Sequence, residues 1–154
     1  MYFMLNRMII EDCPVCGKSV VLRISGKQHK EWEHYILYGR DKLIQDALPD
    51  FDKFEREFIK TKLCPNCQEK IFDAKVPEYK EPHKWIIIED SLSNDKWRGF
   101  LANAKEKRQR PADALIAQKD SFSAEEKIAM IALLGEDYYV DNKGEIIPME
   151  KEGL

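Results

Sequence analysis

Four cysteines arranged as two Cys-Pro-x-Cys pairs are the strongest chemical signal in the sequence. One pair is Cys13 and Cys16, the other is Cys64 and Cys67, and no cysteine is left over. Zinc binds four thiolates in a tetrahedron, and a CxxC loop is short enough to aim two sulfurs at one ion. Four sulfur ligands leave no coordination position for an activated water. The pattern therefore predicts one structural Zn²⁺ ion and no catalytic metal.

Two disulfides are the alternative interpretation of the same four cysteines. A secretory signal would place small residues after its apolar run, whereas Glu11, Asp12 and Cys13 follow the apolar start of this chain. We therefore expect a cytoplasmic protein, in the host cell cytosol, where reducing conditions favour thiolate ligation over disulfides. No apolar stretch approaches the roughly 20 residues that span a bilayer, so no membrane partner is expected.

The elements that must position the sulfurs differ between the two pairs. Residues Met1–Ile10 and Ser19–Ser25 read as strands around the first pair, and Gly17 supplies the positive φ that a zinc knuckle often needs. The second pair is followed by Gln68–Phe72, which are compatible with a helix. A knuckle combined with ligands at a helix start favours a treble clef. Two knuckles on two hairpins would instead make a zinc ribbon.

The segment between the cysteine pairs is unusually long and is expected to fold as a helical insert. It holds 47 residues, against a usual spacing of roughly 15 to 20. Apolar residues at helical spacing predict two short helices, and Asp52 with Glu55 has the spacing of a capping box. Glu55 and Glu57 are expected on solvent faces. A metal bound by both pairs would close this long loop.

A break near residues 77–82 divides the chain, because Pro77 and Pro82 bracket charged residues there. After this linker we expect a buried strand at Trp85–Glu89 and several helices. One helix follows Ser91–Asn94, one opens at Pro111, and one is capped by Ser123 and ends at Gly135. A hairpin is expected at the end of the chain, from Tyr138–Val140 and Glu145–Ile147.

The expected architecture is therefore an α+β fold. Residues 1–76 form a four-cysteine treble-clef or zinc-ribbon module with a helical insertion, and residues 77–82 form a linker. Residues 83–154 form a small mixed α/β lobe with helices and a terminal hairpin. The composition, 44% hydrophobic and 34% charged, is that of a folded protein.

One basic run is a candidate contact for nucleic acid. Within the predicted helix 96–110, the cations are Lys105, Lys107, Arg108 and Arg110, and Trp97 lies nearby for stacking on a base. Against this, the formal net charge is −3, and a metal with four thiolates would make it more negative. A solvated helix face is the alternative interpretation of the same run.

Residues 43–72, LIQDALPDFDKFEREFIKTKLCPNCQEKIF, together with CPVCGK at 13–18, resemble a group of small zinc-finger proteins encoded by bacteriophages and prophages. The shared features correspond to Ile44–Asp46, Pro49, Arg56–Phe58 and Cys64–Cys67, and the resemblance covers about residues 10–75. It implies a phage or mobile-element origin and a zinc-binding role for the cysteines, and it implies no activity. Gln68 departs from the pattern, because relatives tend to carry an aromatic residue there.

Three functions are compatible with these observations. A saturated metal site without a recognisable catalytic motif favours a non-catalytic protein-binding module, whose partner is a host or phage protein. By analogy with other phage proteins, the target could be a host defence or transcription system. The second is a nucleic-acid-binding regulator that uses the basic run, and the third is an enzyme whose site is assembled from scattered residues. The sequence does not indicate an oligomeric state.

Overall fold

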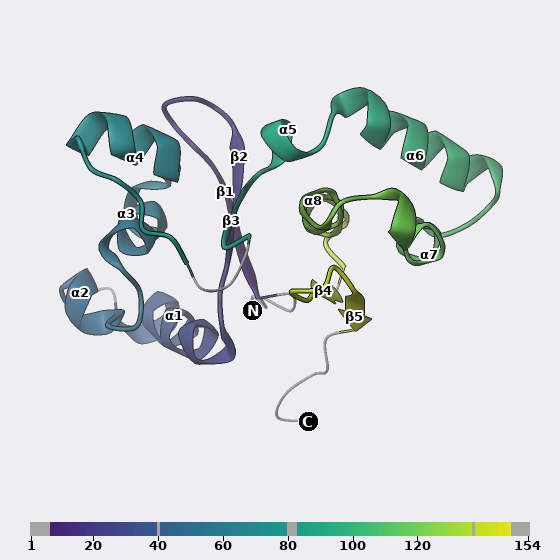
Figure 1. Cartoon of the computed structure of the whole chain (residues 1–154). Coiled ribbons are helices and arrows are strands. Elements are labelled where there is room, and N and C mark those ends of the chain that lie inside the picture. The colour runs from purple at the N-terminus through teal and green to yellow at the C-terminus, as the bar shows by residue number, and fades with distance from the viewer. Residues whose placement is uncertain (1–6, 40, 80–82, 137, 149–154) are drawn as a thin grey trace.

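A computed structural model shows a small antiparallel sheet with helices on both of its faces (Figure 1). The structure describes residues 7–39, 41–79, 83–136 and 138–148. Helices α1–α4 lie on one side of the sheet, and α5–α8 lie on the other side together with a second, two-stranded sheet. The α+β class predicted from the sequence is thus confirmed. In the described part of the chain, every helix is too short or too polar to cross a membrane.

The three-stranded sheet joins segments that are far apart in the sequence. Its strands are β1 (Met8–Asp12), β2 (Ser19–Arg23) and β3 (Trp85–Ile87), in the order β1-β2-β3. In the first pair Ile9 lies opposite Leu22, and in the second pair Leu22 lies opposite Trp85. The central strand therefore holds the two parts of the chain in one sheet.

The side chains of β2 pack into two different hydrophobic cores, one on each face of the sheet. Val20, Val21 and Leu22 are all fully buried, because both faces of the sheet are covered. Val20 and Leu22 pack with the cysteines and α3, whereas Val21 packs with α6 and α8. This division follows from the two-residue period of a strand, which sends alternate side chains to opposite faces.

Four helices lie on the first face: α1 (Gly26–Tyr38), α2 (Ile44–Ala47), α3 (Lys53–Thr61) and α4 (Pro65–Phe72). Complete capping boxes open α1 at Ser25 and α3 at Asp52, and α3 ends at Lys62 in the left-handed conformation. Phe51, Phe54 and Phe58 are buried, as expected from their spacing on one helical stripe.

On the second face, the helices are α5 (Ile88–Ser91), α6 (Asn94–Glu106), α7 (Pro111–Ala117) and α8 (Ala124–Leu134), with a short 3-10 helix at Lys119–Ser121. The capping box of Ser123 with Glu126 opens α8, and Gly135 ends it with a φ of 67°. Strands β4 (Tyr138–Val140) and β5 (Ile146–Pro148) form the terminal hairpin. The predicted caps and the hairpin are confirmed.

Several predicted boundaries differ from the structure. The first strand is Met8–Asp12 rather than Met1–Ile10, and residues 1–6 of that prediction lie outside the described residues. The third strand ends at Ile87, because Ile88–Ser91 turn into α5. The division at 77–82 stays a prediction, although the segments on either side share one sheet. Part of that linker, residues 80–82, and the end of the tail, residues 149–154, lie outside the described residues.

Candidate metal centre

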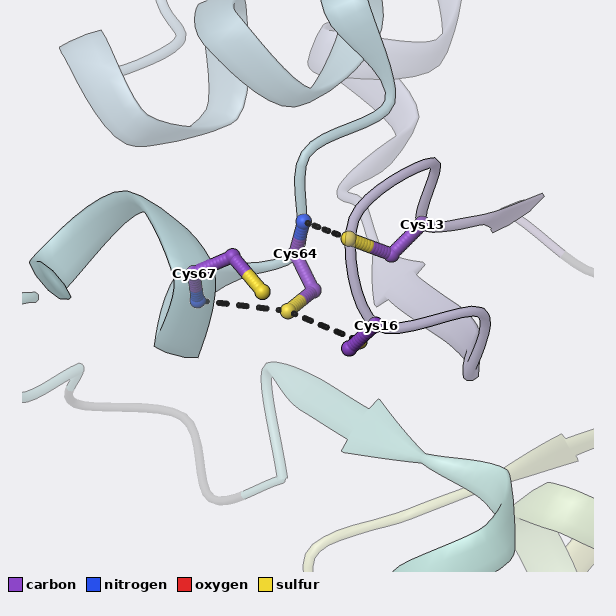
Figure 2. Close-up of side chains that lie close together, drawn as sticks. All are labelled: Cys13, Cys16, Cys64 and Cys67. Carbon is purple, nitrogen blue, oxygen red and sulfur yellow. Dashed lines mark hydrogen bonds between the residues drawn. The ribbon is translucent and has the colours of Figure 1, made fainter. Parts of the chain in front are cut away.

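The four cysteine sulfurs point toward one another at one end of the β1–β2 hairpin (Figure 2). Their Sγ atoms all lie within 4.8 Å of one another, so the four residues could hold one metal ion. Cys13, Cys64 and Cys67 are buried, whereas Cys16 is exposed. The candidate ion would therefore lie at the surface of the molecule, with the Cys16 side open to solvent.

The first pair lies in the turn that joins β1 to β2. The Cys13 N–H donates to the Lys18 carbonyl at 2.9 Å, and the Gly17 N–H donates to the Cys13 carbonyl at 2.8 Å. Gly17 has a φ of 75°, a conformation that costs glycine little and other residues more. The predicted role of this glycine in the cysteine turn is confirmed, because the turn reverses the chain at that residue.

The second pair opens a helix, which is what the residues after Cys67 predict. Cys64 is the N-cap of α4, Pro65 is its first residue, and Cys67 lies within its first turn. The Cys67 N–H donates to the Cys64 Sγ at 3.3 Å, so the thiol accepts from a backbone donor that the helix leaves unpaired. One ligand thus serves also as the helix cap.

The spacing of the sulfurs fits a tetrahedral metal ion. Metal–sulfur bonds of about 2.3 Å place the sulfurs of a tetrahedron about 3.8 Å apart. The Sγ atoms of Cys16 and Cys64, one from each pair, are separated by 3.7 Å. The Cys64 N–H also donates to the Cys13 Sγ at 3.4 Å, a contact that stabilises a thiolate and joins the two pairs.

Burial acts to raise the pKa values of the buried cysteine thiols, and backbone N–H donors act to lower those of Cys13 and Cys64. Burial raises the pKa of Cys13, but the N–H groups of Cys16, Cys64 and Val15 outweigh burial and lower this pKa to about 6. At Cys64 burial dominates and raises the pKa to about 12, and burial also raises the pKa of Cys67. A metal ion must displace the protons of Cys64 and Cys67, so its binding releases protons at neutral pH.

Gln68, the residue after the last cysteine, braces the second cysteine pair. Its side chain is 1% exposed. The Nε2 atom donates to the carbonyl of Phe54 at 3.0 Å and to the carbonyl of Leu63 at 2.9 Å. The amide thereby ties α3 and the residue before Cys64 to the first turn of α4.

The four basic residues proposed for nucleic acid are all exposed, but they do not share a helix. Helix α6 ends at Glu106, not near residue 110, so only Lys105 lies within it. Lys107 is its C-cap, Arg108 has a φ of 56°, and Arg110 precedes α7 and lies 3.5 Å from a Glu136 carboxylate oxygen. The run is therefore a cationic segment, the cationic loop, that begins in the last turn of α6 and continues through the connection to α7.

A buried polar cluster at the start of α3 was missed by sequence reasoning. The prediction that Glu55 faces solvent is wrong, since this residue is 2% exposed. Its Oε2 atom lies 3.5 Å from the Lys84 Nζ, and the Nζ donates to the Gln28 Oε1 at 2.9 Å. Glu55 is four residues after Phe51 and three before Phe58. That spacing already places it on the buried face.

The same cluster holds the segment before β3 against α3. Tyr79 donates its hydroxyl hydrogen to the Asp52 carboxylate, and the Trp85 Nε1 donates to the Tyr79 hydroxyl at 3.4 Å. Burial is the main cause that raises the pKa of Glu55, with the N–H of Asp52 and the cation of Lys84 opposing it. The charge pair is thus a second link between the two parts of the chain, in addition to the sheet.

Comparisons with known proteins identify no relative: no family model, no curated protein and no solved structure matches the chain.

Proposed function

We propose that this chain is a non-catalytic, zinc-binding accessory protein that acts as a protein-binding module. One Zn²⁺ ion held by Cys13, Cys16, Cys64 and Cys67 would have a structural role. The position of the first pair in a β-hairpin turn and of the second at a helix start supports a treble clef over a zinc ribbon.

The observation that carries this proposal is the completeness of the ligand set. Four thiols within 4.8 Å of one another satisfy a tetrahedral zinc ion without water, and a site of that kind stabilises a fold instead of activating a substrate. The ion would close the loop that contains α1, α2 and α3, and its binding free energy would contribute to the folding of these helices.

A phage or prophage origin, which rests on the resemblance of residues 10–75, would make the partner a host or phage protein in the cytosol. An inhibitor of a host defence or transcription system is the specific form of this proposal. It would act by occupying a surface of its target, so its effect would follow binding stoichiometry and not turnover.

The test is recovery of a partner from host lysate with the zinc-loaded full chain, with and without nuclease. The proposal expects a nuclease-resistant protein that, once purified, binds the chain directly in a defined stoichiometry measured by calorimetry. If the purified chain instead turned over a nucleotide or nucleic acid, and a point mutation outside the cysteines abolished the turnover, the proposal would be wrong.

A nucleic-acid-binding regulator is the second candidate, and the cationic loop favours it. Lys105 in the last turn of α6, and Lys107 and Arg108 directly after that helix, are exposed, so they are accessible to phosphate groups. A gel-shift titration over salt tests this candidate with a variant in which Lys105, Lys107, Arg108 and Arg110 become alanine. A control variant with equal charge loss changes four exposed lysines elsewhere: Lys42, Lys60, Lys70 and Lys75. Equal affinities for the two variants would remove the candidate.

A further inference from the structure

The outer edge of β3 offers unused backbone hydrogen-bonding groups. The Arg23 N–H donates to the Lys84 carbonyl at 2.9 Å, so residues 84 and 86 direct their backbone groups toward β2. The alternation of an antiparallel ladder therefore directs the N–H groups of Trp85 and Ile87 away from β2. Within the part of the chain that the structure describes, neither of these N–H groups has a hydrogen-bond partner.

A groove of about 620 Å³ runs along this edge. Trp85, Ile86 and Ile87 line it from the strand itself. Glu78 and Tyr79 line it from the side of α3, whose N-cap Asp52 accepts a hydrogen bond from Tyr79. Asp90 and Glu125 line it from the opposite side, in α5 and α8. The groove therefore has the strand edge along its length and one wall from each face of the sheet.

The charge of this groove is predominantly negative. Three carboxylates, those of Glu78, Asp90 and Glu125, line it. Lys84 also lines it, but its ammonium group is turned inward to Glu55, and its side chain is 10% exposed. His83 Nδ1 lies 3.2 Å from a Glu125 carboxylate oxygen, and the Asp90 carboxylate is paired with Lys18 at 2.9 Å. Glu78 has no ion-pair partner among the residues that the structure describes.

We propose that this groove binds an extended segment of a partner protein, rich in lysine or arginine, as a fourth strand beside β3. The inference rests on the proposed protein-binding function and names its surface and the chemistry of its partner. Backbone groups of the segment would pair with the N–H groups of Trp85 and Ile87 and with the Trp85 carbonyl. Basic side chains on one face of the segment would meet Glu78, and those on its other face would meet Asp90 and Glu125, because successive residues of a strand point to opposite faces.

The first experiment uses a capped nonapeptide in which pairs of valines alternate with pairs of lysines, so that both faces of the strand carry lysine, titrated into zinc-loaded, ¹⁵N-labelled full chain. The proposal expects amide shift changes centred on Trp85, Ile86 and Ile87. A peptide with glutamate in place of lysine should bind at least about tenfold more weakly, because like charges then face each other. No shift changes at β3 with millimolar lysine peptide, or equal binding of both peptides, would overturn the inference.

The second experiment removes one edge donor. Ile87→Pro deletes the outward N–H of residue 87. Because this N–H makes no hydrogen bond to β2, the substitution leaves the β2–β3 ladder intact. Ile87→Val is the control that keeps the N–H. The φ of Ile87, −96°, lies about 30° from the central proline value of about −65°. We expect Ile87→Pro to weaken peptide binding about tenfold, the value of one hydrogen bond, with Ile87→Val unchanged. Unchanged binding by Ile87→Pro overturns the proposal.

A third variant covers the case in which proline disturbs the fold. Glu78→Lys reverses an exposed charge that has no ion-pair partner among the described residues, and it should weaken binding of the lysine peptide and strengthen binding of the glutamate peptide. If either change in peptide binding fails to occur, the proposed groove is contradicted.

The proposed groove and the proposed function can be refuted separately. A purified protein partner that binds Ile87→Pro and Glu78→Lys as tightly as wild type refutes the groove alone. A chain that binds the peptide but no protein refutes the proposed function alone.

Discussion

The two faces of the β1-β2-β3 sheet cover cores that are built differently. On the α1–α4 face, Cys13, Cys64 and Cys67 pack among Phe51, Phe58 and Leu48, and the charge pair of Glu55 with Lys84 is buried nearby. On the α5–α8 face, aliphatic residues of α8 pack with Phe100 and Leu115. The buried cations of that face, Arg23 and Lys127, donate to backbone carbonyls of the terminal hairpin.

This difference means that the two cores respond to different conditions. A core that contains metal ligands and a buried carboxylate depends on metal supply and on pH. A core of apolar side chains depends on packing and is largely indifferent to both. The following experiments separate these dependences, from the largest expected effect to the smallest.

Removal of the metal should have the largest effect and should be confined mainly to the first face. A structural zinc contributes about 10 kcal/mol or more to the folding of small zinc modules. We expect chelation, or Cys64→Ser, to abolish protection from hydrogen exchange in α1, α3 and α4 while α6 and α8 keep more of theirs. A Cys64→Ser variant with the melting temperature of wild type would contradict the structural role of the ion.

The matching experiment on the second face is Phe100→Ala. Phe100 is 5% exposed and packs against Trp97 and Phe122, with ring centroids 5.8 Å away in each case. The truncation should lower the free energy of unfolding by about 3–5 kcal/mol, measured by denaturant titration. Zinc content should stay at one ion per chain, and a loss of zinc would show that the two cores are not separable in this way.

Lys84→Met tests the buried charge pair. It leaves the Glu55 carboxylate unpaired, and we expect a loss of about 3 kcal/mol at pH 7. Burial holds the pKa of Glu55 above its ordinary 4.5, so the folded state binds this proton more tightly than the unfolded chain. Protonation of Glu55 therefore stabilises the folded state as the pH falls. The difference in unfolding free energy between wild type and Lys84→Met should accordingly shrink toward pH 4.5.

The control for this pH dependence is Glu55→Gln combined with Lys84→Met, which carries no titrating group at the pair. Its unfolding free energy, compared with wild type over the same range, should lack the slope that Lys84→Met shows. A slope of the same size in both variants would assign the pH dependence to other carboxylates.

The smallest expected effects are the stability losses on removal of one helix cap on each face, Ser123 of α8 and Asp52 of α3. Ser123 accepts only from its own helix α8, and Ser123→Ala should cost about 1 kcal/mol. Asp52 caps α3 in the same way and also accepts from the Tyr79 hydroxyl, so Asp52→Ala should cost about 2 kcal/mol. Equal losses in thermal or denaturant unfolding would mean that the Tyr79 contact contributes nothing to stability.

The sequence predicted those parts of the fold that local chemistry determines. The caps Asp52 and Ser123 mark the starts of α3 and α8, Gly17 and Gly135 have the positive φ that their positions require, and the residues after Cys67 continue as a helix. The four candidate metal ligands could be named for the same reason, since each CPxC loop brings two sulfurs together within four consecutive residues.

What could not be predicted depends on contacts between distant segments. The strand Trp85–Ile87 was expected, but its pairing with β2 is not encoded in its own residues. The partners of Glu55 are Lys84 and Gln28, 29 residues after it and 27 before it, so only the fold brings them together. The groove beside β3 follows from the same pairing, because it exists only once that strand is the edge of the sheet.

The position of β2 in the middle of the sheet has a consequence for the nascent chain. Leu22 lies opposite Trp85, which the ribosome adds 63 residues later, or about 3–13 s at ordinary synthesis rates. Cys67 is made well before Trp85, so the hairpin, α1–α4 and the metal can assemble first. Val21 then faces outward until β3 and α8 arrive, and vectorial synthesis makes the half with the four cysteines the template on which the second half folds.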